Sequence, residues 1–248
     1  MADWAVVTGG GSGIGRALAI ELASKCELHV LIIGRRLKPL RETASHVPER
    51  ITVLTADVGR EEDRLRVSER ITTEKGRLKF LIHNAAVLQP VKPLSAIAPE
   101  EWKNHFAINV EGPLFLTQRL LPFMKKGSRI LHISSGAAHH AYAGWGAYCA
   151  AKAALYALYR VWNLELETRG ICVGSVRPGV VDTPMQNLVR QASPEVFPAL
   201  DKFVKLKKEG QLLSPVTVAR YIIRLLIETD DKTFASKEWD IRKDKLGT

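Results

Sequence analysis

A tyrosine and a lysine stand four residues apart in Tyr148-Cys149-Ala150-Ala151-Lys152, and on a helix this spacing puts both side chains on one face. A phenol can give its proton to a carbonyl oxygen as a hydride reaches the carbon, provided that its pKa falls from about 10 toward the working pH. A nearby cation lowers that pKa because it favours the phenolate. We therefore interpret Tyr148 as a candidate proton donor and Lys152 as its charge partner. The alternative is a lysine whose stem packs beside a half-buried tyrosine.

Further polar residues lie where they can join this pair. Ser134 and Ser135 end an apolar, strand-like segment shortly before Tyr148, so a hydroxyl there can face a cleft at the end of the strand. Asn109 lies in the middle of a helical pattern. Because asparagine is unfavourable inside a helix, its position indicates a role other than helix formation.

A glycine-rich turn, Thr8-Gly9-Gly10-Gly11-Ser12-Gly13-Ile14-Gly15, stands between the first predicted strand and the first predicted helix. Such a turn lets the backbone approach a pyrophosphate, whose charge is attracted by the free N–H groups at the start of the helix. The general pattern G-x-G-x-x-G cannot be placed here, and Walker A fails because Arg16 stands where lysine is required. The pattern that fits is T-G-x-x-x-G-x-G.

Two arginines follow the second predicted strand, in Gly34-Arg35-Arg36. NAD sites usually carry an acidic residue there, about 20 residues beyond the turn, for the ribose 2′-hydroxyl. A guanidinium suits a 2′-phosphate, which a carboxylate would repel. The sequence therefore favours NADP(H) over NAD(H), unless both arginines point to solvent.

Apolar strand-like segments alternate with helical ones along the chain, which predicts an α/β fold with a doubly wound parallel sheet covered by helices on both faces. The length fits a single domain, residues 1–248. A polar, proline-punctuated stretch after Pro184 predicts a substrate loop or lid over residues 185–213, against the alternative of a surface elaboration. The expected strands are Trp4–Thr8, Leu28–Ile33, Ile51–Ala56, Phe80–His83, Ser128–Ser134 and Ile171–Arg177, and the expected helices are Ile14–Lys25, Lys38–Ser45, Glu61–Lys75, Pro99–Met124 and Tyr148–Thr168.

Composition narrows the function classes. The net charge of +10 is compatible with nucleic acid, but acids are mixed with the bases, and no aromatic-interleaved basic stripe is present. We therefore expect no nucleic-acid partner. No apolar run is long enough to span a bilayer and the N-terminus starts directly with a strand, so we expect a cytoplasmic protein. The three cysteines show neither a disulfide framework nor metal-ligand spacing, and we expect no metal. Cys149 is interpreted as a packing residue rather than a nucleophile.

These motifs together resemble the short-chain dehydrogenase/reductase family, which implies a Rossmann-type fold and a catalytic tetrad of Asn109, Ser135, Tyr148 and Lys152. In the family the serine hydrogen-bonds the substrate oxygen and the asparagine holds a water in the proton relay. The resemblance also implies a nicotinamide cofactor, with the adenine near Asp57-Val58 and the nicotinamide bordered by Arg177-Pro178-Gly179-Val180-Val181-Asp182-Thr183. The implied cofactor-binding residues are Thr8, Gly9, Gly11, Ser12, Gly13, Ile14, Gly15, Arg35, Arg36, Asp57, Val58, Asn84, Ala85, Tyr148, Lys152, Pro178, Gly179, Val181 and Thr183.

The C-terminal third resembles a narrower branch, the sepiapterin and benzil reductases. The residues that carry this are 182–186, 207–214, 225–228 and 234–236. Both activities reduce one keto group of a vicinal dicarbonyl with NADPH. We expect an apolar dicarbonyl first and a pterin second, and a non-catalytic NADPH-binding regulator is the third possibility. Family members pair through two long helices, which implies a homodimer or a tetramer.

The pocket residues separate these substrates. A pterin has an edge of hydrogen-bond donors that would be bound by a buried carboxylate. Asp240 aligns near the acid that anchors the pterin in sepiapterin reductases. The alternative for Asp240 is a surface acid. Tyr142, Trp145 and Met185 are candidate apolar walls.

Overall fold

Residues 3–73 and 76–246, which the computed structural model describes, are built on one parallel sheet in the order β3-β2-β1-β4-β5-β6-β7. The chain winds outward from β1 to β3, then returns to β4 on the other side of β1. The predicted α/β, doubly wound parallel sheet is therefore confirmed. Ligands of such sheets bind where the strand order reverses, beyond the carboxyl ends of the strands. The strands are β1 Trp4–Thr8, β2 His29–Gly34, β3 Ile51–Thr55, β4 Leu78–His83, β5 Arg129–Ile133, β6 Cys172–Arg177 and β7 Glu238–Asp240.

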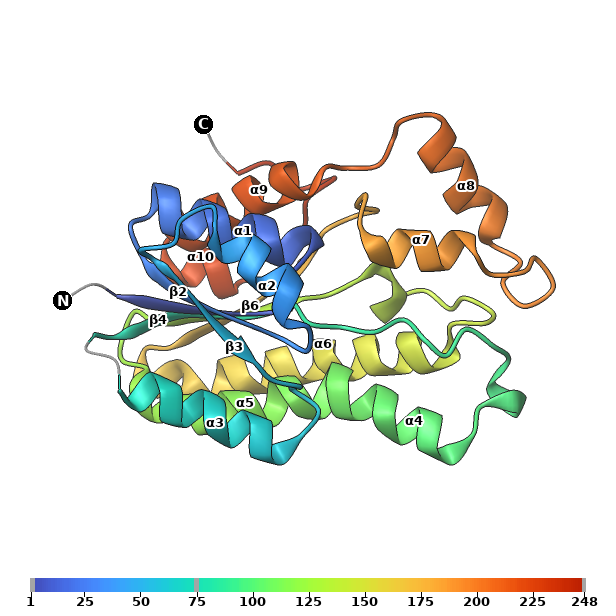
Figure 1. The fold of residues 1–248 in the computed structure, drawn as a ribbon. Helices are drawn as coiled ribbons and strands as arrows, with labels where there is room; N and C mark the ends of the chain where they lie inside the picture. Colours follow the sequence, from blue (N-terminus) through green and yellow to red (C-terminus); the bar gives the residue numbers. More distant parts are fainter. Residues whose placement is uncertain (1–2, 74–75, 247–248) are drawn as a thin grey trace.

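Helices cover both faces of the sheet (Figure 1). One face carries α1 Gly13–Lys25, α2 Leu37–Ala44, α9 Pro215–Ile227 and α10 Asp231–Ala235; the other carries α3 Glu61–Thr72, α4 Pro99–Phe106, α5 Gly112–Leu120 and α6 Gly146–Leu166. The strands are buried from both sides, which explains why they are apolar at nearly every position. In the described ranges, no helix combines the length and apolar character needed to cross a membrane.

The predicted helix over Pro99–Met124 is not continuous. A π-helical turn, Ala107–Glu111, separates α4 from α5, and a 3-10 turn follows α5. Asn109 lies in the π turn, and its carboxamide bonds the backbone of Val87 in the loop after β4. Such single π turns are frequent at functional sites. The helix predicted to reach Lys75 ends at Thr72, and residues 74–75 lie outside the described part.

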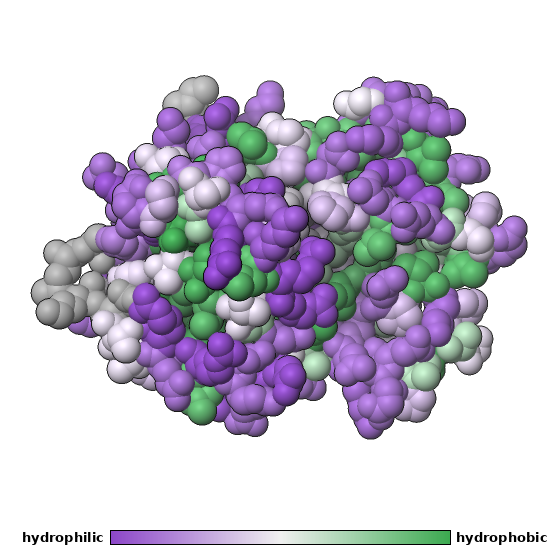
Figure 2. Space-filling model, in the orientation of Figure 1, coloured by the Kyte–Doolittle hydropathy of each residue, from purple (hydrophilic) through white to green (hydrophobic). Residues whose placement is uncertain are grey.

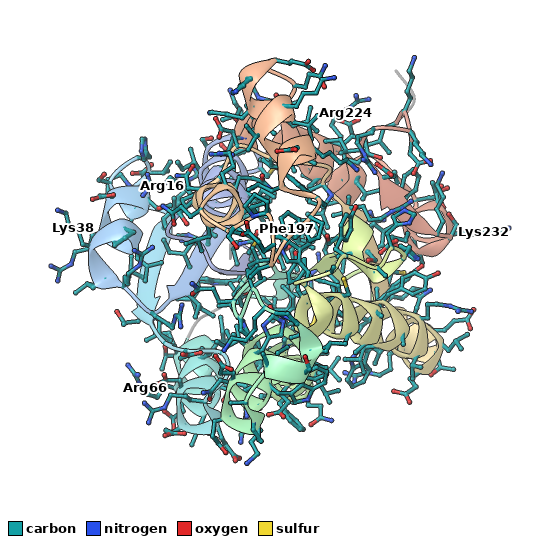
Figure 3. All side chains as sticks on the ribbon, turned by 90° about the vertical axis from the view of Figure 1, so that its right-hand side faces the viewer. Arg16, Lys38, Arg66, Phe197, Arg224 and Lys232 are labelled. Carbon is teal, nitrogen blue, oxygen red and sulfur yellow. The ribbon has the colours of Figure 1, made fainter. Side chains whose placement is uncertain are left out.

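Two helices, α7 Pro184–Arg190 and α8 Leu200–Lys208, stand beyond the carboxyl edge of the sheet, at the right of Figure 1. The segment between them is anchored by Phe197, which is 0% exposed and stacks on Trp145 with ring centroids 4.5 Å apart. Figure 3 places Phe197 near the centre of the view, whereas Lys38, Arg66, Arg224 and Lys232 lie toward its outline. The segment predicted as a lid is thus attached at its centre.

Candidate active site

A cavity of about 820 Å³ lies at the carboxyl ends of the strands, under α7 and α8. Figure 2 shows apolar surface in the hollow on this side of the molecule. The cavity wall brings together the glycine-rich turn, both arginines, the nicotinamide-border segment and most of the predicted catalytic and substrate residues. Four predicted site residues lie behind the wall rather than in it: Thr8, Gly15, Asn109 and Asp240.

The glycine-rich turn is tied to the loop after β4. The Thr8 hydroxyl accepts hydrogen bonds from the backbone N–H groups of Asn84 and Ala85, both at 3.0 Å. The Asn84 amide donates to the Thr8 carbonyl at 2.9 Å. Arg16 braces the other side, because its guanidinium donates to the Gly11 carbonyl at 2.8 Å. The structure thus gives Arg16 a bracing role that sequence reasoning missed.

The turn fits an anionic group. Gly9 and Gly13 have φ of +70° and +53°, a region that side chains disfavour. Ser12, the N-cap of α1, makes no side-chain capping bond, and the first turn of α1 contains no acid. The N–H groups at the start of α1 therefore have no capping side chain, which is what a bound pyrophosphate requires.

The two arginines border the cavity beside this turn. Arg35 lies 4.0 Å from Asp57 and is more than half exposed. Asp57 is itself held by the loop after β3, because its Oδ1 accepts from the Gly59 N–H at 2.9 Å. Arg36 is the N-cap residue of α2. The cavity therefore presents two arginines beside the glycine-rich turn.

Tyr148 and Lys152 lie in the first turns of α6, and both side chains are buried. The Lys152 ammonium donates to the Ile133 carbonyl at 2.8 Å and lies 5.7 Å from the centroid of the Tyr148 ring. Ser135 follows β5, and its Oγ accepts from the Ala137 N–H at 3.2 Å. That bond leaves the Ser135 hydroxyl hydrogen for another acceptor.

The pKa of Tyr148 moves opposite to the predicted direction. Burial raises it to about 12, and only the interaction with the Ser135 hydroxyl opposes the rise among the main causes. Lys152, whose ammonium donates to the Ile133 carbonyl, is not among the main causes that act on this pKa. Burial lowers the pKa of Lys152 to about 8, against the charge of Glu238. At neutral pH the phenol therefore carries its proton and most of the lysine is charged, but the raised pKa makes Tyr148 a weaker acid than an ordinary tyrosine.

The predicted substrate walls lie together. Tyr142 and Trp145 have ring centroids 5.2 Å apart, and Phe203 from α8 lies 5.3 Å from Trp145. Met185 from α7 also borders the cavity. Cys149 is turned away, since its thiol donates to the His140 carbonyl and burial raises its pKa. A raised pKa disfavours the thiolate, which agrees with a packing role.

Asp240 is neither a surface acid nor a part of the cavity wall. It is 1% exposed, and its two carboxylate oxygens accept from Arg242 at 3.0 and 2.8 Å. Arg177 lies 3.5 Å from the same carboxylate. Arg242 borders the cavity instead, so the C-terminal tail presents a guanidinium there. The sequence contains no local signal for this, because β7 has only three residues.

Comparisons with known proteins point to the short-chain dehydrogenase family. A family model for short chain dehydrogenase matches residues 3–194. Benzil reductase ((S)-benzoin forming) from Bacillus cereus is 32% identical over 237 residues, covering 92% of this chain and 95% of that protein. A short-chain dehydrogenase/reductase structure from Saccharomyces cerevisiae has a TM-score of 0.88 at 26% identity, covering 98% of this chain and 97% of that one. A short-chain dehydrogenase from Shigella flexneri, complexed with NADP, has a TM-score of 0.79 at 27% identity and covers 97% of both chains.

Proposed function

Because this chain belongs to the short-chain dehydrogenase family of oxidoreductases, we propose that it is an NADPH-dependent reductase acting on one carbonyl of a vicinal dicarbonyl. The observation that carries the proposal is the position of Tyr148. Its buried, protonated phenol stands between a phosphate-binding turn with two arginines and an aromatic wall, in one cavity. A proton donor between a dinucleotide site and an apolar pocket suits carbonyl reduction.

The residues of the chain handle the proton and the carbonyl oxygen. A nicotinamide cofactor held in this cavity would supply the hydride. The Ser135 hydroxyl, whose oxygen is held by the Ala137 N–H, donates a hydrogen bond to the substrate oxygen, and the Tyr148 hydroxyl gives that oxygen its proton. The Lys152 ammonium favours the phenolate that remains. Asn109 stabilises the adjacent loop through Val87, and we retain it as the fourth member of the tetrad.

We propose NADPH rather than NADH on the basis of Arg35 and Arg36. Arg35→Ala is expected to raise the KM for NADPH about 10- to 100-fold and to leave the KM for NADH nearly unchanged, since a charge-assisted bond to the 2′-phosphate is lost. Initial rates with each cofactor measure this. Lys38→Ala, a basic residue outside the cavity wall, is the matched control. Equal losses with both cofactors would contradict the role of Arg35.

The substrate end of the cavity favours an apolar dicarbonyl over a pterin. Among the described residues that line the cavity, Asp57 is the one acid, and it lies beside Arg35 at the cofactor end. The acid proposed as a pterin anchor, Asp240, is fully engaged by arginines. The aromatic residues Tyr142, Trp145 and Phe203 supply surface for aryl groups. The relative from Bacillus cereus, a benzil reductase, is consistent with this choice.

A substrate panel tests the proposal. With NADPH, we expect aryl vicinal diketones such as benzil to be reduced with kcat/KM at least about 10-fold above that for sepiapterin, because a pterin finds no carboxylate. The loss of reduced-nicotinamide absorbance measures the rates, and simple ketones serve as a reference. Preferred reduction of sepiapterin would support the second candidate. NADPH binding without turnover of any carbonyl would support the regulator.

We also propose a cytoplasmic homodimer formed through α5 and α6. Large apolar side chains are exposed on these helices, among them Leu164, which is 73% exposed, with Val161 and Phe115. Exposed apolar surface of this kind marks protein interfaces. A tetramer would need a further surface.

A further inference from the structure

His105 is a buried histidine whose two ring nitrogens both have protein partners. It lies in the last turn of α4 and is 1% exposed. Its Nδ1 lies 2.7 Å from the Gln89 carbonyl oxygen, and its Nε2 lies 2.8 Å from the Asn109 Nδ2. Its ring meets the Tyr148 ring edge-on, with centroids 6.3 Å apart. It therefore contacts the catalytic tyrosine, the tetrad asparagine and the loop after β4.

The hydrogen bonds around Asn109 determine the protonation of His105. Asn109 Oδ1 accepts from the Val87 N–H at 3.0 Å, which identifies the other end of the carboxamide as the NH₂ group. One NH₂ hydrogen goes to the Val87 carbonyl at 3.0 Å, and the other points at His105 Nε2. Nε2 must therefore accept, and Nδ1 must carry the proton that is donated to Gln89. Burial lowers the pKa of His105, in agreement with a neutral ring.

These bonds hold one wall of the cavity. Val87 and Gln89 are alternate residues of the loop after β4, and the cavity is bordered by this loop from Asn84 to Gln89. Asn109 is hydrogen-bonded to the loop at Val87, and His105 is hydrogen-bonded to it at Gln89. A third hydrogen bond links the side chains of Asn109 and His105 to each other. Each ring nitrogen of His105 is thus occupied by one of these hydrogen bonds.

We propose that His105 is a positioning residue: as the neutral Nδ1–H tautomer it fixes the Asn109 carboxamide and the loop at residues 84–89 in the placement that the substrate carbonyl needs beside Tyr148. The inference rests on the proposed reductase function. Misplacement of reacting groups by about 1 Å can cost about 100-fold in rate, so a residue that fixes the wall affects turnover without touching the substrate.

Two substitutions test the role. His105→Leu removes the bonds to Gln89 and Asn109, and we expect it to lower kcat about 10- to 100-fold. The NADPH dissociation constant should change little, because the glycine-rich turn is held at the other end of the loop by the bonds of Thr8 to Asn84 and Ala85, which remain. His105→Gln keeps a donor and an acceptor on one side chain and is expected to restore most of the lost kcat. His29→Leu is the control for removing a histidine. His29 is the first residue of β2, at the amino ends of the strands, and its ring stacks on Trp4.

A spectroscopic measurement makes the test independent of activity. ¹⁵N-edited NMR of the imidazole in the wild-type protein should show the Nδ1–H tautomer of His105 from neutral pH downward past the usual titration range of histidine. An Nε2–H tautomer, a charged ring at neutral pH, or a His105→Leu variant with wild-type kcat would each overturn the inference. If His105→Leu does not fold, failure of a folded His105→Gln variant to keep kcat would overturn it. If the wild-type protein reduces no carbonyl, the proposed function is wrong. The tautomer measured by NMR then still shows whether His105 makes the hydrogen bonds described here.

Discussion

Tyr148→Phe is expected to lower kcat for carbonyl reduction by about 10²- to 10⁴-fold, the usual contribution of a positioned proton donor. The substitution removes one oxygen and keeps the ring, which packs edge-on against both His105 and Trp145. The shape of the cavity and the packing of α6 should therefore persist. NADPH binding should also persist, because the glycine-rich turn and the arginines are unaffected.

Single-turnover rates with an aryl diketone and a fluorescence titration with NADPH measure the two properties separately. Tyr159→Phe is the matched control, since Tyr159 lies on the same helix, is also buried, and has a pKa raised to about 12 by the same cause. Tyr159 is outside the cavity wall. A Tyr148→Phe variant that keeps more than about a tenth of the wild-type rate would show that another group donates the proton.

Gly15→Ala is expected to raise the NADPH dissociation constant about 10- to 100-fold and to lower the midpoint of thermal unfolding. An added methyl group would overlap the Gly9 carbonyl oxygen and would lie 2.5 Å from the Asn84 Nδ2. Forcing extra volume into a packed site costs about 1–3 kcal/mol, which outweighs the roughly 1 kcal/mol by which alanine is the better helix residue. The turn, the residue Asn84 and the start of α1 would all have to move.

Gly11→Ala in the same turn is the control for that substitution. Its added methyl would meet Pro39 at 3.2 Å, and the backbone there does not require a positive φ. We expect this variant to bind NADPH within a few-fold of wild type, a cost below the roughly 1.4 kcal/mol that corresponds to tenfold. Calorimetric titration and thermal unfolding compare the two. Similar binding by both variants would mean that the turn adapts and that close approach at Gly15 is not required.

The strands and the residues at their carboxyl ends were predictable because they depend on local patterns. Buried parallel strands are apolar throughout, so β1 begins and ends where the sequence predicted, and the other five predicted strands are found within two residues of their expected ends. In a doubly wound sheet those ends meet along one edge. Ser135 and Arg35 therefore reach one cavity although they are far apart in the chain.

The features that sequence reasoning missed depend on contacts between distant segments. The π turn at Asn109 depends on the Val87 backbone, 22 residues away. The pKa of Tyr148 depends on how deeply α6 is buried, which the spacing to Lys152 does not reveal. Asp240 is buried because β7 pairs with β6, which brings Arg177 beside it; its nearer partner Arg242, two residues along the chain, does not by itself indicate burial. Such long-range partners leave no periodic pattern in the sequence.

The packing of Phe197 on Trp145 limits how the substrate range of this protein can change during evolution. The ring fills the space behind Trp145, and Trp145 is the N-cap residue of the helix that carries Tyr148. A smaller residue at position 197 or 145 would enlarge the room for substrate and at the same time loosen the support of Tyr148, the proposed proton donor. New substrate range at this wall therefore trades against catalytic precision, whereas an exposed cavity-lining position of α7 such as Leu188 lies outside the buried cluster around Trp145. Selection for new substrates would be expected to accumulate substitutions there first.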